Sequence, residues 1–166
     1  MDWHRPVPRF VTSGGGLYCP ACDEIIESCS VSVDLFDDGG DSTRWYRTAR
    51  MRWRGVDWPF ARYRRHLGDD RPSHPEDLYL GGAAGERVSS AWTGLYDECR
   101  SPVIDRLHAS PRGGMSSDDL WAEAVVRLMS DCKECGLLPD GRRPARIIRF
   151  RGRSSLRTYL YVTALR

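Results

Sequence analysis

Hydrophobic residues recur at spacings of three and four over residues 88–107, the pattern of a helix with one apolar face. Pro102 lies within this stretch. Because proline lacks the backbone N–H that a helix interior uses, we expect it to kink or split the helix. A second helix follows the breaker at residues 111–114. We expect Ser116 or Ser117 to cap it, and the two aspartates that come next favour the positive end of its dipole.

The last amphipathic stretch opens after Gly152 and continues to Arg166, with Ser154 as the expected N-cap. Residues 131–148, which precede it, are rich in Gly, Pro and Arg, so this segment is expected to be a linker.

Two shorter helices are predicted nearer the N-terminus. Residues 57–67 suggest the first, and residues 74–80, with a proline suited to a first helical turn, suggest the second. Gly81, Gly82 and Gly85 follow directly. Because glycine is a poor helix former, we expect these three residues to weaken any long continuous helix here.

The N-terminal third of the chain has little helical periodicity. Hydrophobic and polar residues alternate over 31–35 and again over 49–53, with glycines at 39 and 40 between them, so a hairpin is one interpretation and disorder is the other. The pattern as a whole predicts an all-α fold with an irregular or weakly β N-terminal extension. The expected parts are an extension of unknown role (1–56), a helical leader (57–87) and a main helical domain (88–166).

Composition favours a globular protein. The 166 residues are 40% hydrophobic and 29% charged, and no apolar run approaches the roughly 20 residues needed to span a bilayer. The first ten residues lack the apolar core of a signal peptide. We therefore expect no membrane association and a cytoplasmic location.

Positive charge gathers at the C-terminal end, although the formal net charge is only +2. Eight arginines occur from Arg142 onward, and no acidic residue follows Asp140. Such a one-sided segment suits contact with phosphate groups, although a preference for Arg over Lys is equally a product of a GC-rich genome. A second basic stretch, residues 44–65, is interleaved with aromatic residues.

Four cysteines form two C-x-x-C pairs, Cys19 with Cys22 and Cys132 with Cys135. This is the spacing of a zinc knuckle, but more than a hundred residues separate the pairs, so a shared zinc site is weakly supported. In a cytosolic chain we expect thiols or metal ligands before disulfides. A redox role for the second pair is the other interpretation, and our expectation is that no metal or other cofactor is bound.

Three segments occur in fixed order: AWTGLYD (91–97), DDLWAEAVVRLM (118–129) and FRGRSSLRTYLY (150–161). Together they resemble the second conserved region of extracytoplasmic-function sigma factors, which are members of the sigma-70 family. The third segment is the most specific, and residues 74–80 resemble a leader that precedes this region in some sigma-like proteins. The resemblance covers residues 74–166 and implies a small helical bundle that binds core RNA polymerase and promoter DNA, and that is not an enzyme.

The second segment is implied to dock on the clamp coiled coil of core RNA polymerase through an acidic and apolar helix face. Asp119 and Glu123 are four residues apart and share such a face. A solvated face with Glu123 paired to Arg127 explains the same charges. Ala122 stands where many relatives have glutamine, so one polar contact is expected to be missing. The residues implied to bind polymerase are Asp119, Leu120, Glu123, Val126 and Arg127.

The third segment is implied to hold the unpaired minus-ten element of the promoter. Opening the duplex costs a few kcal/mol per base, and each base stacked on an aromatic ring contributes roughly 1–3 kcal/mol. Arg157 and Tyr161 share a helix face and are the first candidates, whereas Tyr159 is equally a core residue. The implied DNA-binding residues are Phe150, Arg151, Arg153, Ser154, Ser155, Arg157, Thr158, Tyr161 and Arg166.

Other functions remain open from sequence. One is a zinc- or thiol-dependent interaction domain on a sigma-like scaffold, and another is a general Arg-rich nucleic-acid binder that uses residues 44–65. No P-loop, nucleophile elbow or paired-carboxylate motif is present, so enzymatic activity is not expected. The resemblance admits an anti-sigma factor as a further partner. Because the chain ends inside its last helix, we expect it to lack the domain that reads the minus-thirty-five element and not to direct promoter-specific transcription alone.

Overall fold

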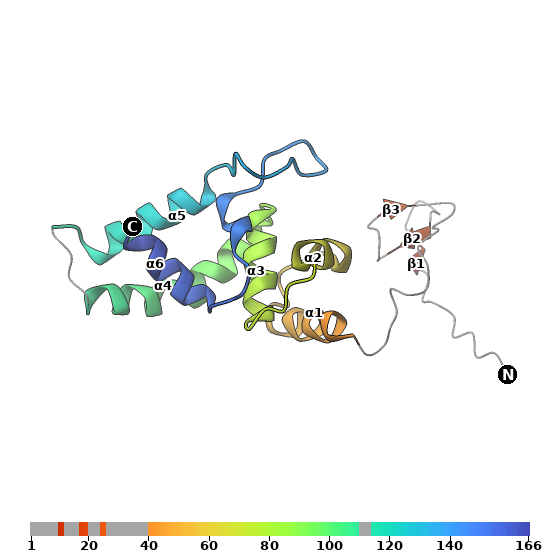
Figure 1. The fold of residues 1–166 in the computed structure, drawn as a ribbon, viewed down its shortest axis with the longest axis horizontal. Helices are drawn as coiled ribbons and strands as arrows, with labels where there is room; N and C mark the ends of the chain where they lie inside the picture. The colour runs from red at the N-terminus through yellow and green to blue at the C-terminus, as the bar shows by residue number, and fades with distance from the viewer. Residues whose placement is uncertain (1–9, 12–16, 20–23, 26–39, 110–113) are drawn as a thin grey trace.

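A computed structural model describes residues 10–11, 17–19, 24–25, 40–109 and 114–166 (Figure 1). Three short strands, β1 (Phe10–Val11), β2 (Leu17–Cys19) and β3 (Glu24–Ile25), pair antiparallel in that order. The other elements are α1 (Asp41–Arg52), α2 (Phe60–Leu67), α3 (Pro75–Gly85), α4 (Ser89–His108), α5 (Ser117–Met129), the 3₁₀ helix η2 (Arg146–Arg149) and α6 (Leu156–Ala164). The all-α fold expected from the sequence is confirmed.

Helix α3 is the centre of the helical body and packs against α1, α2, α4, α6 and η2. Every residue from 78 to 85 is buried. A Cβ atom at Gly82 would lie 2.3 Å from the Trp58 ring, and one at Gly85 would lie 2.7 Å from Ile148. The expectation that the glycines weaken this helix is therefore wrong. The helix continues through Gly81 and Gly82 and ends at Gly85. Neighbouring side chains lie against its backbone, and this tertiary packing outweighs the low intrinsic helix propensity of glycine.

An aromatic cluster joins α1 and α2 to α3. Trp58, Tyr63 and Tyr79 are fully buried, and their rings pack edge-on or tilted against one another. The Tyr46 ring packs against Phe60, Tyr63 and Tyr79. The Tyr79 hydroxyl accepts a hydrogen bond from the Trp58 backbone N–H at 3.1 Å. Trp53, Trp58 and Tyr63 of the basic stretch 44–65 thus lie in the core, and Trp45, Tyr46 and Phe60 pack against it partly buried.

The predicted hairpin is wrong over residues 49–53, since this segment ends helix α1. Ala49 and Trp53, one helical turn apart, are both buried against the core, whereas Met51 between them is exposed. A short run of alternating hydrophobic and polar residues is compatible with a strand and with the edge of a helix. Here packing against α3 favours the helix. Residues 31–35, the other half of the hairpin, lie outside the described residues. The helical body therefore begins at 41, not at 57.

Helices α4, α5 and α6 form the other half of the body (Figure 1). Their buried faces supply Leu95 and Leu107 from α4, Trp121 from α5, and Leu160 from α6. Helix α4 continues through Pro102, so the proline does not split it. One core cluster runs from Ala49 to Ala164, and the expected leader and main domain share it.

Both cap predictions can be judged from hydrogen bonds. The Ser116 hydroxyl accepts the Asp119 backbone N–H at 3.1 Å and caps α5, as expected. At α6 the cap is Ser155, which accepts the Thr158 backbone N–H at 3.2 Å. The prediction of Ser154 as the N-cap is therefore wrong by one residue. None of the described helices is both long and apolar enough to cross a bilayer.

The close approach at α3 predicts the outcome of Gly82→Ala. The added methyl group would overlap the buried Trp58 ring, so the variant should lose about 1–3 kcal/mol of unfolding free energy in urea denaturation. Gly55→Ala is the matched control, because nothing lies within 4 Å of its Cβ position. Equal unfolding midpoints for the two variants would contradict the packing described here.

Candidate functional site

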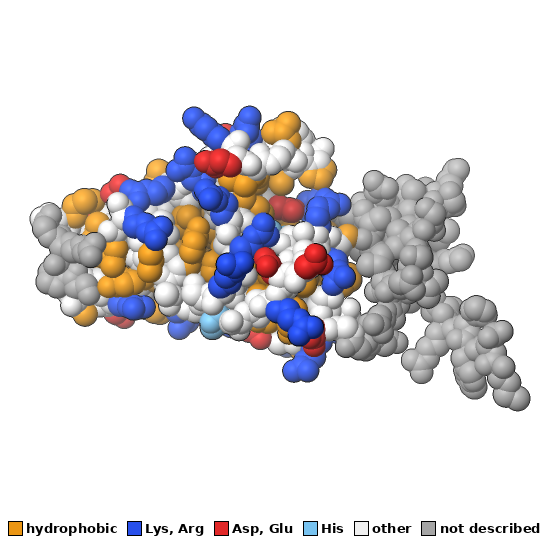
Figure 2. All heavy atoms as spheres, in the orientation of Figure 1, with side chains coloured by type: hydrophobic (Ala, Val, Ile, Leu, Met, Phe, Trp, Pro, Cys, Tyr) orange, Lys and Arg blue, Asp and Glu red, His pale blue; other side chains and the backbone are white. Residues whose placement is uncertain are grey.

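Helix α5 carries one face that no described element covers. Asp119, Ala122, Glu123, Val126 and Met129 are all exposed, and Val126 is 69% exposed. The opposite face packs on α4 and α6. Figure 2 shows hydrophobic and basic side chains interspersed over this half of the body. A face with acidic residues around an exposed apolar centre suits a partner that offers basic and apolar groups.

Three of the five residues implied to bind polymerase meet on this face: Asp119, Glu123 and Val126. Leu120 and Arg127 are instead half-buried beside α6. The charges also have internal partners, since the Asp119 carboxylate accepts the Ser116 hydroxyl at 2.7 Å. Arg127 pairs with Glu123 at 2.6 Å. Exposed pairs of this kind contribute less than about 1 kcal/mol, so an external partner can compete for them.

Arg157 and Tyr161 lie on one face of α6, and that face is turned toward α4. Arg157 forms an ion pair with Glu98 at 3.5 Å. The Arg106 guanidinium lies 4.1 Å from the centre of the Tyr161 ring. Arg157 keeps half of its side chain exposed, whereas Tyr161 is partly buried. These two leading DNA-binding candidates are therefore already engaged within the protein.

Phe150 is not available as a stacking platform, and its prediction as a DNA-binding residue is corrected. Its side chain is 2% exposed, and its ring packs against Tyr159 with the centroids 5.1 Å apart. It also fills the space that a side chain at Gly81 would occupy. Phe150 is a core residue that fixes the entry to α6.

The other predicted DNA-binding residues lie at both ends of α6. Arg151 donates to the His66 backbone carbonyl at 2.7 Å. Arg153 is 83% exposed and lies 3.9 Å from Asp70. The Ser155 hydroxyl donates to Thr158 at 3.0 Å within the helix cap. Ser154 is half-buried just before the cap, and Arg166 is exposed at the far end of the helix.

His66 is a structural residue that no sequence motif pointed to. Its Nε2 lies 3.3 Å from the Phe150 carbonyl, so this nitrogen carries the proton and donates it. Burial, reinforced by the nearby Arg151 guanidinium, lowers the pKa of His66 to about 4. The neutral ring thereby ties α2 to the segment that leads into α6.

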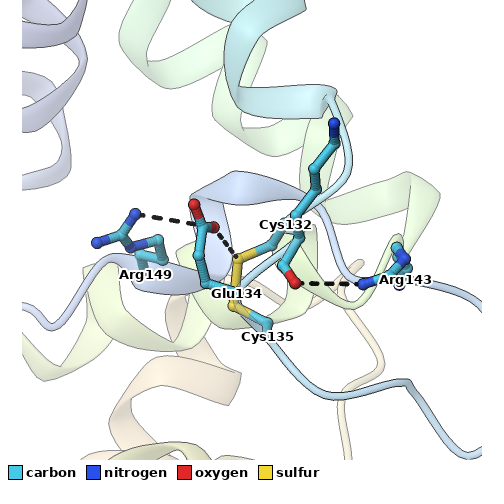
Figure 3. The surroundings of a disulfide bond; sticks show 6 residues. Cys132, Glu134, Cys135, Arg143 and Arg149 are labelled. Atoms are coloured by element: carbon cyan, nitrogen blue, oxygen red, sulfur yellow. Dashed lines mark hydrogen bonds and ion pairs between the residues drawn. A yellow bond between two sulfur atoms is a disulfide. The ribbon is translucent and has the colours of Figure 1, made fainter.

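Cys132 and Cys135 are joined by a disulfide, against the expectation of thiols or metal ligands (Figure 3). Cys132 is fully buried. Glu134 lies between the bridge and Arg149, with its carboxylate 3.6 Å from Cys132 Sγ and 4.0 Å from the Arg149 guanidinium. The bridge closes one end of the 131–148 segment.

The second half of that segment is held by Arg87 and by a backbone pairing. Arg87 donates to the Arg143 carbonyl at 2.9 Å and forms an ion pair with Asp131. Asp131 and Ala145 form an isolated antiparallel bridge. The segment expected to be a linker is therefore an ordered loop.

The remaining metal candidates are Cys19, which lies in β2, and Cys22, which is outside the described residues. Over the described part of the chain, no three His, Cys, Asp or Glu side chains come together as a metal site would require. Comparison with protein families, with curated proteins and with solved structures found no match to the chain.

The depressed pKa of His66 predicts a pH-dependent stability. The unfolded histidine titrates near 6.5 and the folded one near 4, so between these values only the unfolded chain takes up the proton. The stabilisation is fully present above about pH 6.5 and is lost as the pH falls toward 4. His66→Gln should reduce the dependence of the unfolding free energy on pH, measured by urea unfolding from pH 7 to pH 4. A pH dependence identical to that of wild type would contradict this role of His66.

The disulfide predicts a response to reductant. Opening a bridge that closes so short a loop should cost about 2 kcal/mol of stability, which would lower the melting temperature by several degrees. The variant Cys132→Ala/Cys135→Ala is the control, because its melting temperature should not respond to reductant. Alkylation of Cys132 in unreduced wild-type protein, detected by mass spectrometry, would show that the bridge is absent.

Proposed function

We propose that this chain is a sigma-factor-like transcription initiation protein. It binds core RNA polymerase, in the cytoplasm, through the exposed face of α5. It holds promoter DNA at the minus-ten element with the region around α6. It performs no chemistry of its own and binds no cofactor. The observation that carries the proposal is the uncovered face of α5, on which Glu123 and the 69%-exposed Val126 lie side by side within a segment of sigma-like sequence.

The geometry of α5 supports the polymerase half of the proposal. A helix that packs one face on its own protein and leaves acidic and apolar residues on the other is suited to a partner helix with basic residues. The Ser116 cap fixes where this helix begins, so the residues on its face are placed by the fold. An anti-sigma factor, as a further partner, would have to cover the same face.

The DNA half rests on fewer residues than the sequence suggested. Phe150 is core, and Arg157 and Tyr161 contact α4. Arg151, Arg153 and Arg166 remain exposed and are suited to phosphate contacts. Binding of the DNA strand through its phosphate backbone is thus better supported than stacking of its bases on aromatic side chains.

The two alternative functions find less support. The general nucleic-acid binder relied on aromatic residues in 44–65, and Trp58 and Tyr63 of this stretch are fully buried. The zinc- or thiol-dependent domain draws on both C-x-x-C pairs; Cys132 and Cys135 are bonded to each other, which leaves neither thiol to hold zinc, and Cys22 lies outside the described residues.

The test of the proposal is retention of bacterial core RNA polymerase by the tagged full-length chain. Wild type should retain core polymerase, and the variant Glu123→Arg/Val126→Glu should reduce retention at least tenfold, because charge and apolar contact are both reversed. Asp119 is left unchanged, since its carboxylate also bonds the α5 cap. This prediction is checked by quantifying bound polymerase subunits.

Asp105→Arg is the matched control, because Asp105 is an exposed acidic residue that belongs to α4 and not to α5. Its retention of polymerase should equal that of wild type. Failure of the wild-type chain to retain polymerase, or equal retention by the α5 variant, would overturn the proposal. Circular dichroism of each variant separates loss of contact from loss of fold.

A further inference from the structure

A groove of about 440 Å³ runs between α5, η2 and α6, and arginines dominate its lining. We call it the arginine groove; its residues are Arg127, Leu128, Arg146, Arg149, Tyr159, Thr163 and Arg166. The arginines come from two elements, α5 and η2, and from the end of the chain. Arg146, Arg149 and Arg166 belong to the C-terminal run of arginines that the sequence suggests for phosphate contact, and Arg166 is also among the residues that the resemblance implies for DNA.

Three of the four arginines in the arginine groove are poorly neutralised; the exception is Arg127, which pairs with Glu123 at 2.6 Å. No acidic residue lines it. Arg149 has a carboxylate, that of Glu134, only at 4.0 Å, and its side chain is 64% exposed. Arg146 and Arg166 have no acidic partner within the part of the chain that the structure describes. The guanidinium groups of Arg146, Arg149 and Arg166 lie around one hollow without a close carboxylate and repel each other, and an anion that enters relieves this repulsion.

Tyr159 gives the groove an apolar wall. Its ring packs on Phe150 and is partly buried. Burial raises the pKa of Tyr159, and the neighbouring Arg149 and Arg166 guanidinium groups oppose that rise. The hydroxyl therefore stays neutral and can donate a hydrogen bond beside the two arginines.

A second hollow, of about 280 Å³, adjoins the groove and shares Arg127 and Arg166 with it. Its other lining residues are Met115, Leu120, Glu123, Ala164 and Leu165. Along α5 and α6 a basic section is thus followed by one that is largely apolar apart from Glu123, Arg127 and Arg166. Phosphates and bases alternate in the same way along a single strand, whereas a free nucleotide would need only the first hollow.

We propose that the arginine groove binds the phosphodiester backbone of single-stranded DNA. Arg146, Arg149 and Arg166 contact successive phosphates, and Arg127 lies where the strand passes into the second hollow. The inference rests on the proposed function, because it adds to it the surface that holds the separated strand. It moves the main DNA contact away from the α4-facing side of α6, which Arg157 and Tyr161 occupy.

The experiment measures binding of a fluorescein-labelled twelve-residue oligodeoxythymidine to the full-length chain by anisotropy, over a series of salt concentrations. Arg146→Glu/Arg149→Glu should weaken binding at least tenfold at low salt. Each phosphate contact on a single strand contributes about 0.7 to the salt slope, so the slope should fall by about 1.4. The milder pair Arg146→Gln/Arg149→Gln should lower the slope by the same amount with a smaller loss of affinity.

The control variant is Arg47→Glu/Arg54→Glu, which makes the same change in net charge at two exposed residues of the α1 region. It should bind within about twofold of wild type. Equal weakening in the control and the groove variant would show that binding follows net charge alone and would overturn the proposal. Displacement of the oligonucleotide by ATP at lower phosphate concentration would also overturn it, because the groove would then be a nucleotide site.

Polymerase retention separates the two proposals. The groove variant should retain core polymerase as wild type does, because Glu123 and Val126 are unchanged. Loss of oligonucleotide binding with full retention supports both proposals. Unchanged oligonucleotide binding with full retention overturns only the arginine groove. Absence of retention by wild type, with a groove-specific loss of oligonucleotide binding, overturns only the sigma-like function.

Discussion

The absence of side chains at three positions of α3 is the constraint on which the rest of the structure depends. Trp58 lies against the backbone at Gly82, Phe150 at Gly81, and Ile148 at Gly85. These contacts attach three separate segments: α2 and its preceding turn, the entry to α6, and η2. A helix with ordinary side chains would hold its neighbours 8–10 Å away by ridge and groove packing. Here side chains of the neighbouring segments lie directly against the α3 backbone, and α3 is buried over most of its length.

The candidate surfaces inherit their geometry from this arrangement. The α6 helix begins where it does because Asp77 of α3 accepts the Leu156 backbone N–H at 2.8 Å and because Ser155 caps the first turn. His66 holds the Phe150 carbonyl from the other side. Residues that the sequence assigned to DNA, such as Phe150 and Ser155, are thus partly occupied in fixing the helix. Contacts with partners are therefore left to the residues that this scaffold keeps exposed.

The sequence predicts what is local and periodic, and it misses what depends on tertiary contact. The α5 helix, its Ser116 cap and its exposed acidic face follow from helical spacing and capping chemistry. The continuation of the helix through Gly82 does not follow from the sequence. Helix propensity accounts only for the local cost of glycine and not for the aromatic ring that packs against it. Phe150 was misassigned because a motif does not separate side chains that hold a fold from those that touch a ligand. The sequence indicates the arginine groove only in part: the C-terminal run of arginines suits phosphate contact, but no local pattern brings Arg127 together with Arg146 and Arg166.

The two proposed surfaces meet at one ion pair. Arg127 is held by Glu123 at 2.6 Å, with the Arg and Glu side chains 36% and 52% exposed, and its other nitrogen reaches the Thr163 carbonyl at 3.5 Å. Such a pair contributes little stability, so a basic residue of a partner can take over Glu123 at small cost. The Arg127 guanidinium would then turn wholly to the arginine groove and strengthen its positive potential. Linkage requires the converse as well: a phosphate that engages Arg127 leaves Glu123 more available to a basic partner. Docking on polymerase and capture of a strand would therefore favour each other through a single contact, without any movement of the helices.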